Sequence, residues 1–89
     1  MSDTEDNEDQ AFAEERLIEA VENQIAAGEP AAAMATLNKL TLVGYEREEI
    51  LQLMAQVLAY EVNSMLETDQ PFNLQRYELG LRALPELPE

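Results

Sequence analysis

Carboxylates are the only abundant reactive side chains in this sequence. The chain has 19 acidic residues against 5 basic ones, and it contains no histidine, cysteine or tryptophan. Catalysis by a cysteine or histidine nucleophile system and metal binding by imidazole or thiolate therefore lie outside its chemistry. Acid–base catalysis by paired carboxylates, weak cation binding and ion pairing are what these residue types allow.

No spacing of the acidic residues selects a metal site or a catalytic pair. Residues 3–9 have the composition of a calcium loop, but they lack its central glycine and its glutamate at the twelfth position. The three glycines are too dispersed to form a phosphate-binding loop. We therefore expect no metal, no cofactor and no enzymatic activity, and we keep a carboxylate-based enzyme as a third hypothesis.

One carboxylate, Glu61, stands within the most apolar segment of the chain. At about 100° per residue it falls between Ile50 and Met54 on a helix that is apolar around most of its circumference. A buried carboxylate must pair, take a proton or reach water. Glu61 either pairs with a cation of its own chain or anchors a cation or backbone amide of a partner. The candidate cations are Lys39, Arg76 and Arg82, and the candidate partner-binding residues are Glu61, Tyr60 and Tyr77.

The spacing of apolar residues predicts four helices, which would position Glu61 and the candidate cations. Apolar side chains recur at spacings of three and four in residues 10–27, 30–42, 46–67 and 73–83, and no segment alternates with the period of a strand. The expected apolar stripes are Leu17, Ile18, Val21 and Ile25; Ala33, Met34, Leu37 and Leu40; and Leu74, Tyr77, Leu81 and Leu84. Leu42, Val43, Tyr60 and Leu79 fall outside the main stripes.

Local signals mark where these helices begin and end. Gly28 and Gly44 suit left-handed helix ends, and Gly80 indicates close packing inside the last helix. The third helix begins with Glu46 as its cap and Glu49 in the third position of a capping box, and Tyr45 and Ile50 are placed to form a hydrophobic staple. Asn73 caps the fourth helix, and Phe72 is placed to form a staple with Tyr77.

The fold class that follows is all-α, a compact bundle of four helices with short connections. Residues 1–9 are polar and acidic, so we expect a disordered leader before a helical domain at residues 10–84. Pro85 and Pro88 predict an extended tail over residues 85–89. Because the third helix is apolar over so much of its surface, we expect it to be central or to contact a second chain.

The net charge of −14 argues against nucleic acid and anionic membranes as direct partners. Residues 1–9 are too acidic for a signal peptide, and no apolar run approaches a membrane span, so we expect a cytoplasmic protein. The leading hypothesis is a protein–protein interaction module, adaptor or regulatory, that binds a protein partner or forms a homodimer through a groove of the third and fourth helices. The second is an acidic decoy that mimics nucleic acid and binds a basic protein.

Several segments between residues 23 and 84 also carry a family resemblance. They are Leu37-Asn38-Lys39-Leu40, residues 43–49, residues 57–62, and residues 71–73 with Arg76-Tyr77 and Ala83-Leu84-Pro85. Together they resemble a small bacterial all-helical domain of unknown function. The resemblance implies an all-helical fold and brings no activity with it.

Overall fold

Four helices joined by short connections make up the chain. The structure, a computed structural model, describes residues 2–88, with side chains from residue 14 to residue 88. Within that range the helices are α1 (Ser2–Ala27), α2 (Ala31–Val43), α3 (Arg47–Thr68) and α4 (Leu74–Ala83), and no strand is present. The predicted all-α bundle of four helices is confirmed, and the connections are three, three and five residues long.

The two glycines predicted to end helices do so. Gly28 and Gly44 have φ angles of 73° and 114°, the left-handed region that glycine enters without strain. At the second end the N–H groups of Gly44 and Tyr45 both donate to the carbonyl of Leu40, at 3.1 and 3.0 Å. These bonds satisfy carbonyls that the helix end would otherwise leave free, so each turn is fixed by local chemistry.

The predicted start signals of α3 and α4 are also present. The carboxylate of Glu49 accepts a hydrogen bond from the N–H of Glu46 at 3.4 Å. Asn73 Oδ1 accepts from the N–H of Arg76 at 3.0 Å, which caps α4. The rings of Phe72 and Tyr77 meet edge to face with centroids 5.5 Å apart, as the expected staple requires.

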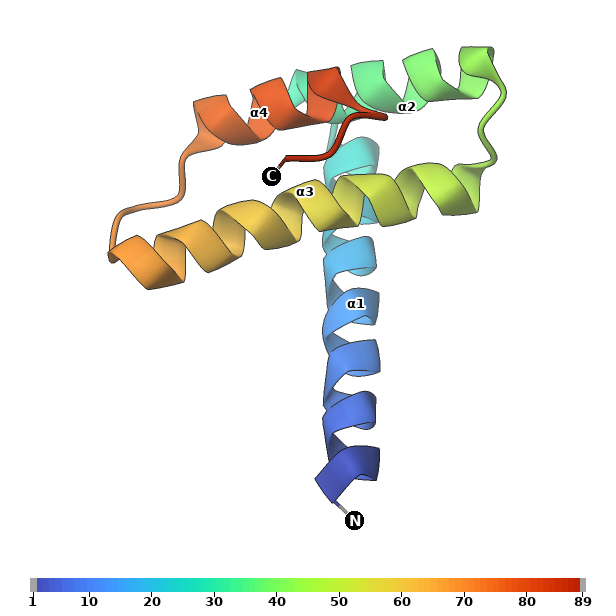
Figure 1. Cartoon of the computed structure of the whole chain (residues 1–89). Coiled ribbons are helices and arrows are strands. Elements are labelled where there is room, and N and C mark those ends of the chain that lie inside the picture. The colour runs from blue at the N-terminus through green and yellow to red at the C-terminus, as the bar shows by residue number, and fades with distance from the viewer. Residues whose placement is uncertain (1, 89) are drawn as a thin grey trace.

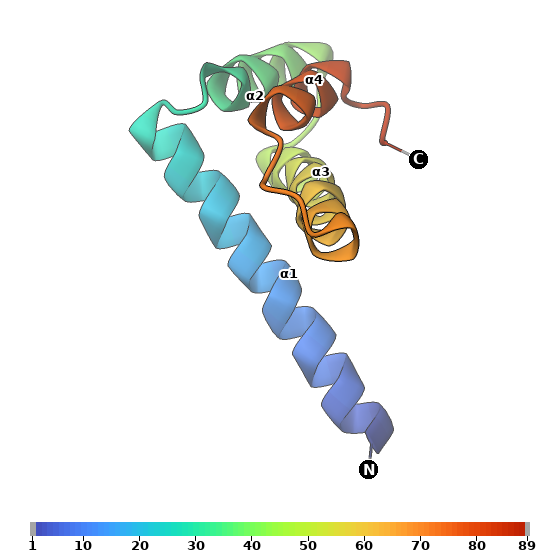
Figure 2. The same cartoon turned by 90° about the vertical axis from the view of Figure 1, so that its left-hand side faces the viewer.

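The helices are arranged around α3. Figure 1 shows α2 and α4 side by side in an upper layer, α3 beneath them, and α1 crossing α3 steeply. The N-terminal half of α1 projects away from the other three helices (Figures 1 and 2). α3 contacts α1, α2 and α4, which confirms its predicted central position.

The core lies where α3 meets its three neighbours. Its fully buried members include Leu40, Ile50, Met54 and Leu81, and Val21 brings α1 into the same cluster. In the middle of this core the Thr36 hydroxyl donates to the carbonyl of Leu81 at 3.0 Å, so the one buried hydroxyl of α2 has its partner.

Two of the predicted stripes are displaced. Met34 and Leu74 are exposed, whereas Ala32 and Thr36 are buried. Thr36 of α2 bonds to Leu81 of α4, and Ala32 and Ala33 are buried, so α2 turns its small side chains to the core and leaves Met34 at the surface. Leu42, Val43, Tyr60 and Leu79 are exposed, in agreement with their positions outside the stripes.

The structure also differs from the sequence prediction at the N-terminus. α1 begins at Ser2, so it includes residues 2–9, for which we expected a disordered leader. At the other end α4 stops at Ala83, before the prolines, and residue 89 lies outside the described residues. None of the described helices is long and apolar enough to cross a membrane.

Gly80 provides a test of the packing of α4 on α3. A Cβ atom at this position would lie 2.8 Å from Cγ1 of Val57, a buried and rotationally restricted side chain. We expect Gly80→Ala to lower the free energy of unfolding by about 1 kcal/mol, because overpacking outweighs the gain in helix propensity. Urea denaturation measures this. Val57→Ala should remove most of the penalty in the double variant, and an increase in stability from Gly80→Ala alone would contradict the close approach.

Candidate interaction site

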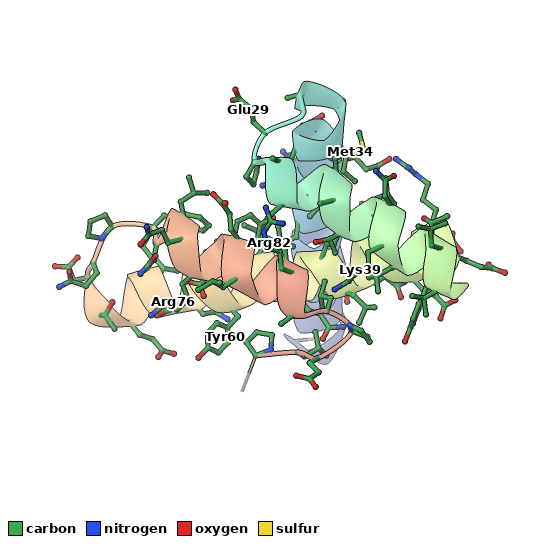
Figure 3. The ribbon with its side chains drawn as sticks, turned by 90° about the horizontal axis from the view of Figure 1, so that it is seen from above. Glu29, Met34, Lys39, Tyr60, Arg76 and Arg82 are labelled. Carbon is green, nitrogen blue, oxygen red and sulfur yellow. The ribbon has the colours of Figure 1, made fainter. Side chains whose placement is uncertain are left out.

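Glu61 is buried and paired within its own chain. Only 3% of its side chain is exposed, and Nε of Arg76 donates to both carboxylate oxygens, at 2.9 and 3.0 Å. Of the three candidate cations the structure selects Arg76. Lys39 instead donates from Nζ to the carbonyl of Arg82 at 2.6 Å, beside the end of α4 (Figure 3). The predicted burial and pairing of Glu61 are therefore confirmed.

Local structure at the start of α4 positions the arginine. The N–H of Arg76 is held by the Asn73 cap, and Nη2 of its guanidinium donates to Oγ of Ser64 at 2.8 Å. Asp69 ends α3 with a φ of 57°, which turns the chain back towards α4. One side chain thus ties the start of α4 to two positions one turn apart on α3.

A cleft opens beside this ion pair. Its volume is about 520 Å³, and it lies between the last two turns of α3, the connection and the first turn of α4. Its apolar side chains are Met65, Pro71, Phe72 and Leu74. Its polar lining residues are Glu61, Ser64, Thr68, Gln70, Asn73, Gln75 and Arg76. The Arg76 side chain is half exposed, so the cleft presents a held cation next to apolar surface.

Tyr77 is a core residue. It is 1% exposed, and its hydroxyl donates to Oε1 of Gln24 at 2.6 Å, which links α4 to α1. Burial raises the pKa of Tyr77 to about 12, although the hydrogen bond to Gln24 lowers it in part. In this arrangement Tyr77 supports the cleft from behind through its contact with Phe72.

Tyr60 belongs to another surface. It is exposed and lines a hollow with Leu87 and Pro88 of the tail, whereas Glu61 lines the α3–α4 cleft. Adjacent residues of a helix diverge by about 100°, which explains why the two face different neighbours. The structure therefore places the three predicted site residues in three environments.

The sequence did not predict that Ser64, Met65, Phe72, Leu74 and Arg76 line one cleft. The sequence did give a signal for Leu74 and Arg76, because the Asn73 cap fixes the first turn of α4 and Arg76 was among the candidate cations. They lie next to Ser64 because α4 folds back on α3, and the spacing of residues along the sequence does not predict that contact.

The chemistry of the cleft favours binding. Glu61 is the only acidic residue among its lining side chains, and it already accepts two hydrogen bonds from Arg76. Among the described residues no group of three or more acidic side chains is placed to hold a metal ion. What the cleft offers a ligand is one oriented guanidinium and several apolar contacts.

Comparisons with protein-family models, with curated proteins and with solved structures find no match to this chain. The resemblance to a bacterial helical domain stays a prediction. The function has to be inferred from the geometry of the surfaces.

The ion pair predicts unequal costs for removing its two partners. Arg76→Ala leaves a buried carboxylate without its cation, so we expect a loss of about 2 kcal/mol in the free energy of unfolding. Glu61→Gln leaves a half-exposed guanidinium that water can solvate, so its loss should be smaller, about 1 kcal/mol. Urea denaturation of both single variants and the double variant measures the coupling. An unchanged melting temperature for Glu61→Gln, or strictly additive losses, would contradict the paired arrangement.

Tyr77 predicts a decline in stability at alkaline pH. The unfolded tyrosine ionises near its ordinary pKa of 10.0, whereas the folded one ionises only near 12. The folded state therefore holds the proton longer, and the stabilisation present below pH 10.0 is lost as the pH rises towards 12. Denaturation over this range should show a steeper decline for the wild type than for Tyr77→Phe. Tyr60→Phe is the control and should keep the wild-type slope; equal slopes for all three chains would overturn the assignment.

Proposed function

We propose that the chain is a protein–protein interaction module, adaptor or regulatory in role, that binds its partner through the α3–α4 cleft. The observation that carries the proposal is the half-exposed Arg76 guanidinium, held by Glu61 and Ser64 beside exposed apolar surface. Arginine and aromatic side chains contribute disproportionately to binding energy at protein interfaces.

A held guanidinium suits this role because it loses little conformational freedom when a partner binds. Its planar edge can donate paired hydrogen bonds to a carboxylate or to backbone carbonyls. Leu74 is half exposed at the rim and Phe72 lies deeper, so a partner side chain would meet apolar contacts next to the cation. In this proposal Glu61 holds Arg76, and Arg76 contacts the partner.

The proposal also covers what kind of molecule binds the cleft and in which compartment the protein works. The occupant is another protein or a second copy of this chain. The absence of cysteine in this sequence favours a reducing compartment, the cytoplasm. The bundle acts as a scaffold that keeps the cleft in shape, and no reaction is assigned to it.

A second candidate function is the acidic decoy. α1 carries nine acidic residues and one arginine, and its N-terminal half projects from the body (Figure 2). A projecting, negatively charged helix offers a basic protein a charge density that resembles a nucleic acid backbone. Binding of this kind depends on salt far more steeply than apolar docking does.

The test is capture of partners by the tagged chain from its native cell, with three chains compared. Leu74→Glu places a charge at the rim of the cleft, and Leu42→Glu places the same charge on an exposed residue at the end of α2. We expect one stoichiometric partner that is retained by the wild type and by Leu42→Glu and lost with Leu74→Glu. Light scattering on the purified chains measures their mass and so tests self-association. If two copies bind through the cleft, the wild type and Leu42→Glu should be dimers and Leu74→Glu a monomer.

Two outcomes would contradict the proposal. Equal retention by all three chains would remove the cleft from the interface. If all three chains lose the partner at moderate salt concentration, the result would favour the acidic-decoy function. Circular dichroism of each variant confirms that both are folded before they are compared.

A further inference from the structure

A second surface lies on the opposite side of α3. One hollow, of about 270 Å³, opens between α1 and α3, and another, of about 310 Å³, opens between α3 and the C-terminal tail. Both are lined by Gln56 and Ala59, so they lie next to each other on the outer face of α3. We call the two hollows together the α3 trough. Its floor residues lie about half a turn around the helix from those that line the cleft, because each residue advances about 100°.

The trough has the dimensions of a docking groove for a helix. Its floor runs from Gln52 to Asn63, about 16 Å at 1.5 Å per residue, which is three turns of a bound helix. Ala55 and Ala59 lie one turn apart on the floor, and their small side chains let another backbone approach closely. A groove of this length would receive apolar anchors spaced three and four residues apart.

The two walls of the trough supply the apolar contacts. Leu17 and Ile18 of α1 are only partly buried against the core and line one side. Tyr60 and Leu87 line the other side, and each is about 40% exposed. An amphipathic segment could therefore place one apolar stripe between α1 and the tail.

Charge decides which amphipathic segment fits. No lysine or arginine lines the trough; its polar floor residues are neutral amides, and Glu14 stands at the α1 side. The α1 sequence is strongly acidic and the helix continues past the trough into the projecting half (Figure 2). A basic segment would be attracted along this whole approach. A second copy would bring another net charge of −14 to the same place, which disfavours a homodimer here.

We propose that the α3 trough binds a basic amphipathic helix of another protein, with its apolar stripe over Ala59 between the two apolar walls and its lysines or arginines towards α1. The inference goes beyond the proposed function, because it uses a different face of α3. An adaptor needs two such faces, and this one can hold its partner while the cleft is occupied.

The test uses a synthetic helical peptide as the probe. The peptide carries leucines at helical spacing of three and four on one face and lysines on the other. Its first control keeps the composition but scrambles the leucine positions, and its second replaces every lysine with glutamate. Fluorescence anisotropy measures binding to the full chain, and amide chemical shifts map the contact.

The matched variants are Gln56→Lys in the trough and Asn38→Lys on α2, two exposed amide side chains whose replacement makes the same change in net charge. We expect Gln56→Lys to weaken binding of the amphipathic peptide by about tenfold or more, and Asn38→Lys to leave it within about twofold. Shifted amides should concentrate between residues 52 and 63.

Three results would overturn the proposal. Equal weakening by both variants, or equal binding of the scrambled peptide, would show attraction by net charge without docking in the trough. Absence of binding by the amphipathic peptide would exclude a basic helix as the occupant. Self-association that Gln56→Lys abolishes would assign the trough to a second copy. None of these results bears on the α3–α4 cleft, which is tested by Leu74→Glu.

Discussion

Every other helix of this protein packs against α3, and the fold depends on that shared contact. A chain of 89 residues without cysteine cannot build a large core or cross-link a small one. Placing one apolar helix among three partners lets the same side chains, such as Ile50 and Met54, serve several interfaces. The bundle therefore concentrates its stability in α3, and both candidate binding surfaces lie on the flanks that α3 leaves uncovered.

The Glu61–Arg76 pair is where stability and the candidate site meet. Burial makes the carboxylate costly unless it has a cation, and the cation lies at the start of α4, so the pair holds the connection in place. The same contact fixes a guanidinium at the floor of a cleft. A residue that secures the fold from inside can in this way prepare a binding group on the outside, without itself touching a partner.

Negative and positive charge lie on different sides of the molecule. The acidic first helix projects from the body, whereas the cleft on the far side of α3 presents an arginine (Figures 2 and 3). The two surfaces would attract partners of different charge. If both proposals hold, the two surfaces on opposite faces of α3 would let one small bundle bind two partners, as an adaptor does.

The amino-acid sequence predicted the four helices and most of their ends and caps, because these features follow from nearby residues: Gly28 and Gly44 at left-handed ends, Asn73 as a cap, and Phe72 edge to face with Tyr77. It also identified Glu61 as a carboxylate in need of a cation. The packing of the helices sets which cation pairs with Glu61, namely Arg76; it also buries Tyr77, leaves Tyr60 on another surface and turns Met34 and Leu74 outward. Those outcomes depend on how far each helix is rotated against its neighbours. Periodicity defines a stripe on each helix, but the rotation that pairs one stripe with another is set by close packing across the whole core.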